Sequence, residues 1–283
     1  MEMLSVRNLN KRYEKFALKN ISICLKKGYI MGFIGRNGAG KTTTLKAILD
    51  LAHRDSGEVE ILGKEVTPSD FSSKQKMGFI FGGVDYFPKK KLKIITDVTK
   101  KFYENWDDKI YQQYLKRFEL DEEKTIDQLS EGMKVKYALS LALSHHAQLL
   151  ILDEPTSGLD PVSRDDLVEL FQELIEDGEK SILFSTHITS DLEKCADYIT
   201  YIKNGEIIAS DEKDQFIDSY RLLKGSKEQL KEQIAAVLIG CKVNSLGFSA
   251  LVKTVDLPSC EGIESEKADL ETIMIYFERK QAQ

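Results

Sequence analysis

Features that mark several protein classes are scarce in this 283-residue chain. Its four cysteines, Cys24, Cys195, Cys241 and Cys260, are isolated and form no Cys-x-x-Cys pair. This argues against a zinc site and fits a reducing cytoplasm. No apolar run approaches the roughly 20 residues that cross a bilayer, and no apolar signal region follows Met1. We therefore expect a soluble, cytoplasmic protein; if it works at a membrane, another chain must supply the spanning helices.

The chain also lacks a large excess of either charge, an internal repeat and a low-complexity tract. Its 40 basic and 46 acidic residues give a net charge of −6, so the composition does not indicate nucleic acid as a partner. The basic cluster at residues 89–93 is best interpreted as a solvated loop face. At this length the chain can form one large domain, or a domain with an appendage.

A glycine-rich loop is the most informative feature that the sequence does contain. Residues 35–42 spell G-x-x-x-x-G-K-T, between an apolar strand expected at 29–34 and a helix expected from Thr43. Glycines let backbone N–H groups turn around phosphate oxygens, and the helix N-terminus adds partial positive charge. Lys41 is expected to reach the β- and γ-phosphates, and the Thr42 hydroxyl to ligate Mg²⁺.

We therefore predict that the chain binds a nucleoside triphosphate. The residues expected to hold the nucleotide are Gly35, Arg36, Asn37, Gly38, Ala39, Gly40, Lys41, Thr42 and Thr43. The alternative is a glycine-rich turn with an exposed lysine, which does not require a strand before it and a helix after it.

Two adjacent carboxylates follow a second apolar strand at residues 149–152. Asp153 is placed to hold Mg²⁺ through water. Glu154 comes one residue later, where a carboxylate can orient or deprotonate an attacking water. An apolar run that ends in Asp-Glu can also be an ordinary strand end with a turn, but its pairing with the phosphate loop favours hydrolysis of the triphosphate.

The order of strands and helices predicts an α/β fold. Short strands are expected at 4–9, 18–25, 29–34, 58–62 and 77–81. Residues 94–144 have a helical pattern, in which Thr96-Asp97 and Asp107-Asp108 could each cap a helix.

After residue 148, strands alternate with helices, which favours a mostly parallel sheet covered on both faces. Asp160-Pro161 is expected to begin one of these helices, and Asn204-Gly205 to form a type I′ hairpin turn. Beyond about residue 214 the periodicity weakens. A helix is expected at 227–239, a strand at 250–255 and a closing helix at 269–278, and we interpret this tail as a small accessory α+β unit.

Three further motifs follow the phosphate loop. Ser130, in Leu-Ser-Glu-Gly-Met, is expected to cap a helix whose free N–H groups point outward. Asp160 ends Ser-Gly-Leu-Asp, directly after the carboxylate pair, and His187 follows the strand expected at 181–185. A capping serine or a lone histidine is by itself usually structural, so only their order in the chain gives these residues a function.

With these motifs in this order, residues 2–215 resemble the nucleotide-binding subunit of an ABC transporter. The resemblance implies a P-loop NTPase core with a mostly parallel sheet, an N-terminal antiparallel β subdomain and an inserted α-helical subdomain at about 85–145. It places the ATP-binding domain at 1–214 and a small C-terminal α+β extension at 215–283.

The resemblance also implies roles for single residues. Glu154, His187 and Lys41 become the catalytic residues of an ATPase, with His187 as the switch histidine. Tyr13 becomes the aromatic residue that stacks on adenine. ATP and Mg²⁺ are the implied cofactors, with Thr42 and Asp153 at the metal.

The signature helix implies a second protomer. Leu129 to Met133 matches the signature L-S-G-G-Q. Ser130 and Gly132 of one protomer would close on the γ-phosphate held by Lys41 of the other, and Asp160 would communicate across the dimer.

Two departures from the family pattern matter. Gly82 stands where the family usually has a glutamine that senses the γ-phosphate, and we expect Asp85, or the Gly82-Gly83 backbone with a water, to replace it. The signature carries Glu131 and Met133 in place of glycine and glutamine. A carboxylate near a triphosphate is unfavourable unless it points away, so the composite site is expected to close more weakly.

The pattern is most similar to a bacterial branch that exports antimicrobial or amphipathic peptides. It implies a separate transmembrane permease, a second ATPase protomer and a peripheral location at the cytoplasmic face of the membrane, with no nucleic acid as partner. Two alternatives stay open. One is a weakly hydrolysing regulatory subunit, and the other is a soluble ABC ATPase that acts on nucleic acid or ribosomes, although this chain lacks the long coiled coil or tandem domains typical of that class.

Overall fold

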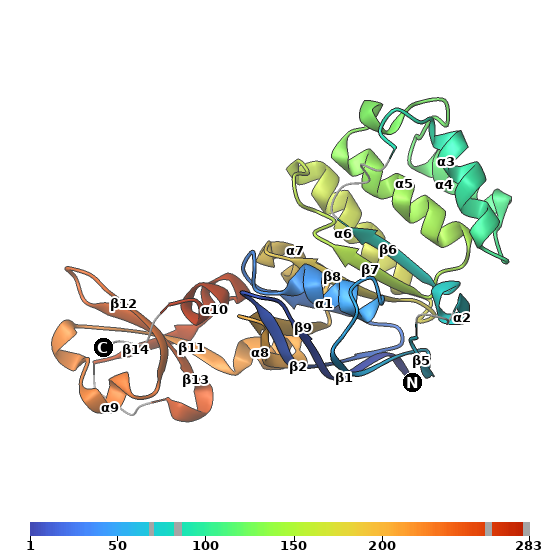
Figure 1. Ribbon diagram of the computed structural model, residues 1–283. Coiled ribbons are helices and arrows are strands. Elements are labelled where there is room, and N and C mark those ends of the chain that lie inside the picture. The colour runs from blue at the N-terminus through green and yellow to red at the C-terminus, as the bar shows by residue number, and fades with distance from the viewer. Residues whose placement is uncertain (68–70, 82–86, 258–261, 280–283) are drawn as a thin grey trace. The chain divides into compact units, whose positions relative to one another are not determined.

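The computed structural model describes residues 1–67, 71–81, 87–257 and 262–279 (Figure 1). The chain divides into two compact units, Met1–Ser210 and Asp211–Gln283. Gly82 and Asp85, which the sequence marks as replacements for the γ-phosphate sensor, lie outside the described residues. Within the described ranges, no helix combines the length and the apolar character that a membrane span requires.

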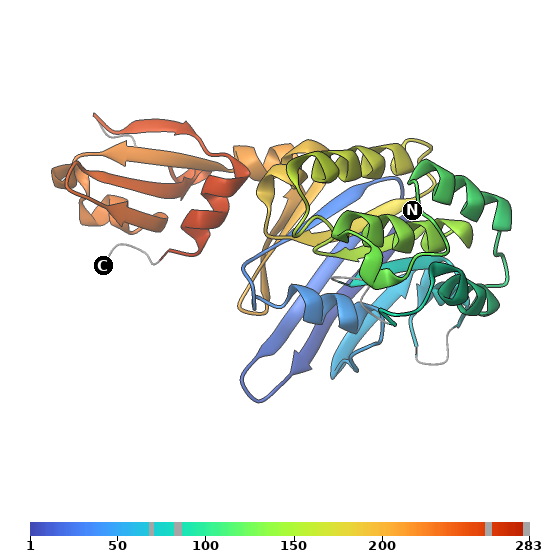
Figure 2. The ribbon, with the colours of Figure 1, turned by 90° about the horizontal axis from the view of Figure 1, so that it is seen from above.

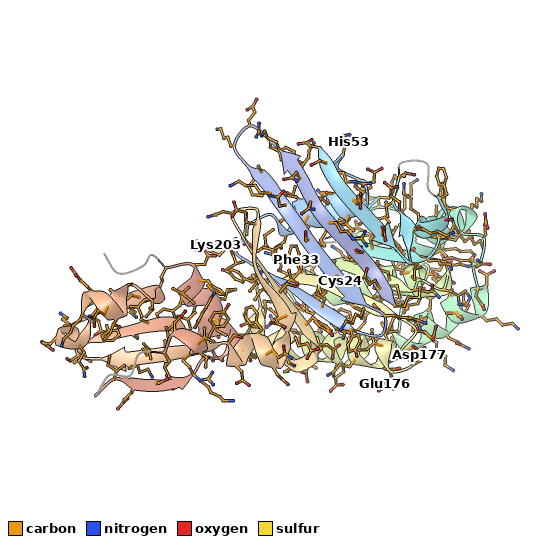
Figure 3. The ribbon with its side chains drawn as sticks, turned by 90° about the horizontal axis from the view of Figure 1, so that it is seen from below. Cys24, Phe33, His53, Glu176, Asp177 and Lys203 are labelled. Atoms are coloured by element: carbon orange, nitrogen blue, oxygen red, sulfur yellow. The ribbon has the colours of Figure 1, made fainter. Side chains whose placement is uncertain are left out.

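The first unit begins with a small antiparallel sheet. Its strands, in spatial order, are β2 (Ala17–Lys26), β1 (Glu2–Arg12), β4 (Ser56–Ile61) and β5 (Lys64–Glu65). In β2, buried Ile21, Ile23 and Leu25 alternate with exposed residues, as expected of a strand that covers a core on one side. Cys24 lies on the exposed side of β2, while Phe33 of the next strand is fully buried (Figure 3).

A larger sheet forms the centre of this unit. Its strands, in spatial order, are β10 (Glu206–Glu212), β9 (Tyr198–Lys203), β3 (Ile30–Ile34), β8 (Ser181–Thr186), β7 (Leu149–Asp153) and β6 (Met77–Phe81). The strands from β9 to β6 are parallel. Every residue of β3, β7 and β8 is buried, which explains the apolar runs at 30–34, 149–152 and 182–184.

Helices cover both faces of the parallel sheet. On one face, α1 (Lys41–Ile48) packs against β7 and against β2 of the antiparallel sheet, and its buried residues join one core with both sheets. On the other face, α6 (Pro161–Ile175) and α7 (Thr189–Cys195) pack against β3 (Figure 2). Phe171 of α6 contacts Phe184 of β8. The predicted α/β fold with a parallel sheet and an antiparallel subdomain is confirmed.

The segment between β6 and β7 is helical. Its helices are α3 (Leu92–Thr99), η1 (Lys100–Phe102), α4 (Asp108–Arg117), η2 (Ile126–Gln128) and α5 (Glu131–Ser144), with the short α2 (Phe71–Lys74) before β6 (Figure 1). Asp107 caps α4 and Asp160 caps α6, as predicted. The predicted cap at Thr96 is wrong. Thr96 lies inside α3, and its buried hydroxyl is satisfied by the hydroxyls of Tyr111 (2.7 Å) and Tyr137 (2.9 Å) instead of by a helix terminus.

The second unit is a small α+β unit (Figure 2). Its antiparallel sheet has the order β12 (Leu238–Val243), β13 (Phe248–Lys253), β11 (Tyr220–Gly225) and β14 (Glu264–Lys267). The helices are α8 (Lys213–Asp218), η3 (Lys227–Gln229), α9 (Glu232–Ala235), η4 (Thr254–Asp256) and α10 (Leu270–Phe277).

One element of the second unit differs from the prediction. A single helix over 227–239 is wrong, because the chain leaves α9 and enters β12 at Leu238. Leu238 packs with Leu223 and Phe248 in the apolar cluster of this unit, and this packing decides the conformation against a weak helical pattern. The closing helix does form as α10, and its cap Asp269 accepts a hydrogen bond from the Thr272 N–H.

Candidate nucleotide-binding site

The phosphate loop connects β3 to α1 in a conformation that requires glycine. At Gly40, φ is 117°, and a Cβ atom would lie 2.8 Å from Phe16. At Gly35, a Cβ atom would lie 2.4 Å from the carbonyl oxygen of Ile202. Side chains are therefore excluded at both ends of the loop, and the loop lies between the end of the parallel sheet and the first turn of α1.

A hollow of about 410 Å³ opens over this loop. The residues that line it are Phe16, Arg36, Asn37, Gly38, Gly40, Lys41, Thr42, Thr43 and Glu154. Seven of the nine loop residues predicted from the sequence therefore share one hollow with the predicted catalytic carboxylate. Of the other two, Ala39 is buried and Gly35 is packed against Ile202.

Glu154 contacts both of the other predicted catalytic residues, Lys41 and His187. The Lys41 ammonium donates a hydrogen bond to the Gly35 carbonyl at 2.8 Å and lies 3.1 Å from Glu154 Oε1. The second oxygen, Glu154 Oε2, is 2.8 Å from Nδ1 of His187. The lysine side chain is only 5% exposed and that of His187 is 43% exposed, so the cluster extends from a buried cation to a solvent-accessible imidazole.

The backbone of Glu154 is left-handed, with φ 52°. For a residue with a Cβ atom this conformation costs on the order of 1–2 kcal/mol. It is held by the Glu154 N–H, which donates to the Ser185 carbonyl at 2.9 Å. Strained residues of this kind persist where the surroundings fix them, and here the strain accompanies a carboxylate placed between Lys41 and His187.

Asp153 is held by two hydroxyl groups. The Thr42 hydroxyl donates to Asp153 Oδ2 at 2.6 Å, and the Ser185 hydroxyl donates to Asp153 Oδ1. Asp153 is 6% exposed and lies at the carboxyl end of β7. A hydroxyl and a carboxylate that meet beside a phosphate loop are the hard oxygen donors that Mg²⁺ prefers, so the residues present fit this ion.

The sequence did not single out Ser185. A signal was available, because an apolar strand at 181–185 ends in a hydroxyl residue two positions before His187. Finding its partner required the register of the sheet, in which Asp153 and Ser185 are cross-strand neighbours.

The signature residues form a separate group at the beginning of two helices. Ser130 caps α5, and its hydroxyl oxygen accepts a hydrogen bond from the Met133 N–H at 3.2 Å. Gly132 faces Leu159 and Ser163 at the start of α6, close to Asp160. The residues that line the hollow over the phosphate loop do not include Ser130, Gly132 or Asp160.

Two charges at these helix starts are stabilised locally. The Ser163 hydroxyl and backbone N–H hold the pKa of Asp160 below its usual range. Glu131, the acidic residue in the signature, forms an ion pair of 2.8 Å with Lys134 one turn later. Lys134 is largely buried, so it provides a fixed counter-charge for the departure at Glu131.

Two aromatic residues lie in the turn between β1 and β2. The Tyr13 N–H donates to the Phe16 carbonyl at 2.7 Å, and Lys11 Nζ lies 5.4 Å from the centre of the Tyr13 ring. Phe16 lines the hollow, whereas Tyr13 is 47% exposed and is not among the lining residues. Phe16 was missed from the sequence, although it stands three residues after Tyr13 in the same turn.

A parallel sheet, a glycine loop that leads into a helix, and a lysine beside an Asp-Glu pair define a P-loop ATPase. Comparison with known proteins gives the family. The ABC transporter family profile matches residues 18–157. The chain is 30% identical over 221 residues to the ABC transporter ATP-binding protein YtrB of Bacillus subtilis (strain 168), across 77% of this chain and 75% of that protein. The chain therefore belongs to the ABC transporter family, as an ATP-binding and ATP-hydrolysing subunit.

Two further similarities are informative. The bacitracin transport ATP-binding protein BcrA of Bacillus licheniformis is 29% identical over 242 residues, across 84% of this chain and 78% of that protein. A solved dimeric bacterial ABC transporter cassette superimposes with a TM-score of 0.66 at 25% identity, and covers 74% of this chain and 98% of the cassette. The branch expected from the sequence and the fold of the ATPase are confirmed.

Proposed function

We propose that this subunit drives export of a peptide or another amphipathic compound through a separate transmembrane permease, as a dimer with a second ATPase protomer. The observation that carries the ATPase part is the contact of Glu154 with both Lys41 and His187. Export of an antimicrobial-type compound is supported by the similarity to a bacitracin transport protein.

The proposed chemistry is in-line attack of water on the γ-phosphate. Lys41 binds the phosphate oxygens, and Glu154 orients the water and accepts its proton. His187 holds Glu154 Oε2, so that the carboxylate keeps one direction. Thr42 and Asp153 would hold Mg²⁺, which when bound neutralises charge on the phosphates. Positioning and charge stabilisation are what phosphoryl transfer needs most.

A second protomer is proposed to complete each site. Ser130 caps α5, a helix of 14 residues whose first N–H groups provide partial positive charge. Gly132, in the first turn of α5, faces Leu159 and Ser163, and Asp160 lies at the neighbouring helix start. These three residues lie outside their own protomer's hollow, and the family includes a dimeric cassette.

The permease is proposed to dock beside β6. An apolar hollow of about 400 Å³ is lined there by Phe79 and Phe81 of β6, Leu141 of α5, and Tyr103, which follows η1. Phe79 is 49% exposed, which is unusual for a large apolar side chain in a strand of the central sheet. Binding at this surface would keep the subunit peripheral, at the cytoplasmic face of the membrane.

The test is to purify the tagged chain from its native membranes in mild detergent and identify its companions by mass spectrometry. A stoichiometric multi-spanning protein is expected, and Phe79→Glu should lose it while still binding ATP. Val243→Glu, at an apolar residue of the second unit that is exposed to a similar degree (51% against 49%), is the matched control. Recovery of only soluble companions, ribosomes or nucleic acid would contradict the transporter proposal.

A weakly hydrolysing regulatory subunit is the second candidate, because Glu131 and Met133 depart from the family signature. Measured turnover of the complex, with and without the permease, separates the two. The Glu131–Lys134 ion pair favours the motor, since the carboxylate charge is already compensated.

A further inference from the structure

We propose that Ser185 is a positioning residue that fixes Asp153 and the Asp153–Glu154 peptide in the geometry needed for metal and nucleotide. The proposal rests on the metal-binding role proposed above for Asp153. The evidence is a set of contacts made by one fully buried serine at the end of β8.

Ser185 contacts both carboxylate residues at once. Its hydroxyl donates to Asp153 Oδ1, its cross-strand neighbour in the parallel sheet. Its backbone carbonyl accepts the Glu154 N–H at 2.9 Å, and the same N–H lies 3.3 Å from the Ser185 hydroxyl oxygen. Ser185 is therefore the only residue in the described part of the chain for which hydrogen bonds to both Asp153 and Glu154 are observed.

Thr42 cannot provide the same support. Its hydroxyl holds Asp153 Oδ2 at 2.6 Å, but it is also the group expected to ligate Mg²⁺. Ser185 faces the interior, is fully buried and has no such second task. Its hydroxyl can hold the carboxylate through the whole cycle, as carboxylates at metal sites are commonly held by hydrogen bonds from behind.

The same short segment also directs Glu154. Two residues after Ser185, His187 contacts Glu154 Oε2, so the end of β8 holds one carboxylate by a hydroxyl and the other by an imidazole. Because Glu154 has a left-handed backbone, its direction depends on the hydrogen bonds of its N–H. Loss of the Ser185 hydroxyl should mainly remove the hydrogen bond that orients the Asp153 carboxylate. The hydrogen bond from the Glu154 N–H to the Ser185 backbone carbonyl is retained.

Ser185→Ala provides the test, with Ser181→Ala as the matched control. Ser181 lies at the opposite end of the same strand, is also fully buried, and donates to the Lys26 carbonyl at 3.2 Å. Mn²⁺ replaces Mg²⁺ as a probe, and its binding to the full-length protein with ADP is measured by electron paramagnetic resonance. We expect Ser185→Ala to weaken Mn²⁺ binding about tenfold, and Ser181→Ala to leave it near the wild-type value.

Two further measurements exclude a general loosening of the fold. Affinity for a fluorescent ATP analogue in EDTA should be unchanged in Ser185→Ala, because Lys41 and the loop bind phosphate directly. Ser185→Cys, which keeps the volume and a weak donor, should lie between wild type and Ser185→Ala, and it replaces the alanine variant if that variant does not fold.

Wild-type Mn²⁺ binding in Ser185→Ala, or equal weakening in Ser181→Ala, would overturn the proposal. Asp153→Asn distinguishes an error in the role of Ser185 from an error in the proposed metal-binding role of Asp153. If Asp153→Asn loses Mn²⁺ and Ser185→Ala does not, only the role of Ser185 is wrong. If Asp153→Asn also binds Mn²⁺ normally, the proposed metal role of Asp153 is wrong as well.

Discussion

The two units of this chain bury different kinds of residue. The first unit buries polar and charged side chains, among them Asp153 and Ser185 near the ends of central strands and Lys41 at the start of α1. In the described part of the second unit, all buried side chains are hydrophobic, such as Leu223 and Leu251. Burial of a polar group is unfavourable unless it is hydrogen-bonded, so each of these groups needs a partner in the interior.

This difference indicates where chemistry and where recognition can take place. The first unit combines a buried cation, two carboxylates and hydroxyl donors within hydrogen-bonding distance of one another. The second unit has an ordinary apolar core, and its edge strand β14 carries exposed charged residues, which discourage pairing with another strand. The following experiments test this contrast between the two units.

The largest effect is expected from Glu154→Gln. Loss of the carboxylate removes the group that orients and deprotonates water, so ATP turnover should fall at least about 100-fold. ATP and the closed dimer should accumulate, as seen by size-exclusion chromatography. Glu266→Gln in the second unit removes an exposed carboxylate paired with Lys224 and should leave turnover unchanged. Wild-type turnover in Glu154→Gln would remove this residue from the mechanism.

A smaller effect is expected on the pH dependence of stability, from the buried His145. Only the first unit can show it, since all four histidines of the chain lie there. Burial lowers the pKa of His145 from 6.5 to about 4, and its ring stacks on Tyr103 at 3.7 Å between centres. The unfolded chain binds the proton more readily, so the stability present above pH 6.5 is lost as pH falls toward 4. The free energy of unfolding should drop by about 2 kcal/mol between pH 7 and pH 5 from this group.

His145→Phe keeps a stacked ring that cannot titrate. Chemical denaturation at pH 7 and pH 5 should therefore show a smaller loss for this variant than for wild type. His53→Gln, which removes an exposed histidine (Figure 3), is the control variant measured at the same two pH values. An equal loss in His145→Phe and wild type would show that another group titrates.

The smallest effect is expected at the turn between β1 and β2. Phe16 lines the hollow, and Phe16→Ala should weaken ATP binding by about 1 kcal/mol if its ring contacts the base. Tyr13→Ala is the paired variant, and isothermal titration of ATP shows which ring is used. A loss only in Tyr13→Ala would mean that the exposed tyrosine folds over the base and that Phe16 only packs against Gly40.

Much of the fold and site could be predicted because it depends on short stretches of sequence. The loop at 35–42 and the Asp153-Glu154 pair stand directly after apolar strands, so their places at strand ends follow from local pattern. The roles of Ser130 and Asp160 as helix caps are equally local, and both caps are observed.

The parts that escaped prediction depend on contacts between distant segments. Ser185 is significant only because β8 pairs with β7 in a register that places it beside Asp153. Thr96 resembled a cap but serves as a buried hydrogen-bond partner for two tyrosines from other helices. The helix expected over 227–239 gave way to β12 because Leu238 joins a core that the sequence does not reveal.

An ammonium group that already has a carboxylate 3.1 Å away is a discriminating receptor for anions. Any anion that approaches Lys41 competes with the Glu154 carboxylate for the ammonium group, and this intramolecular competitor is always present. A monovalent anion gains little by this exchange, whereas the clustered charge of a triphosphate can win it. The carboxylate proposed to activate water is thus also expected to weaken the binding of sulfate and single phosphates relative to that of a triphosphate.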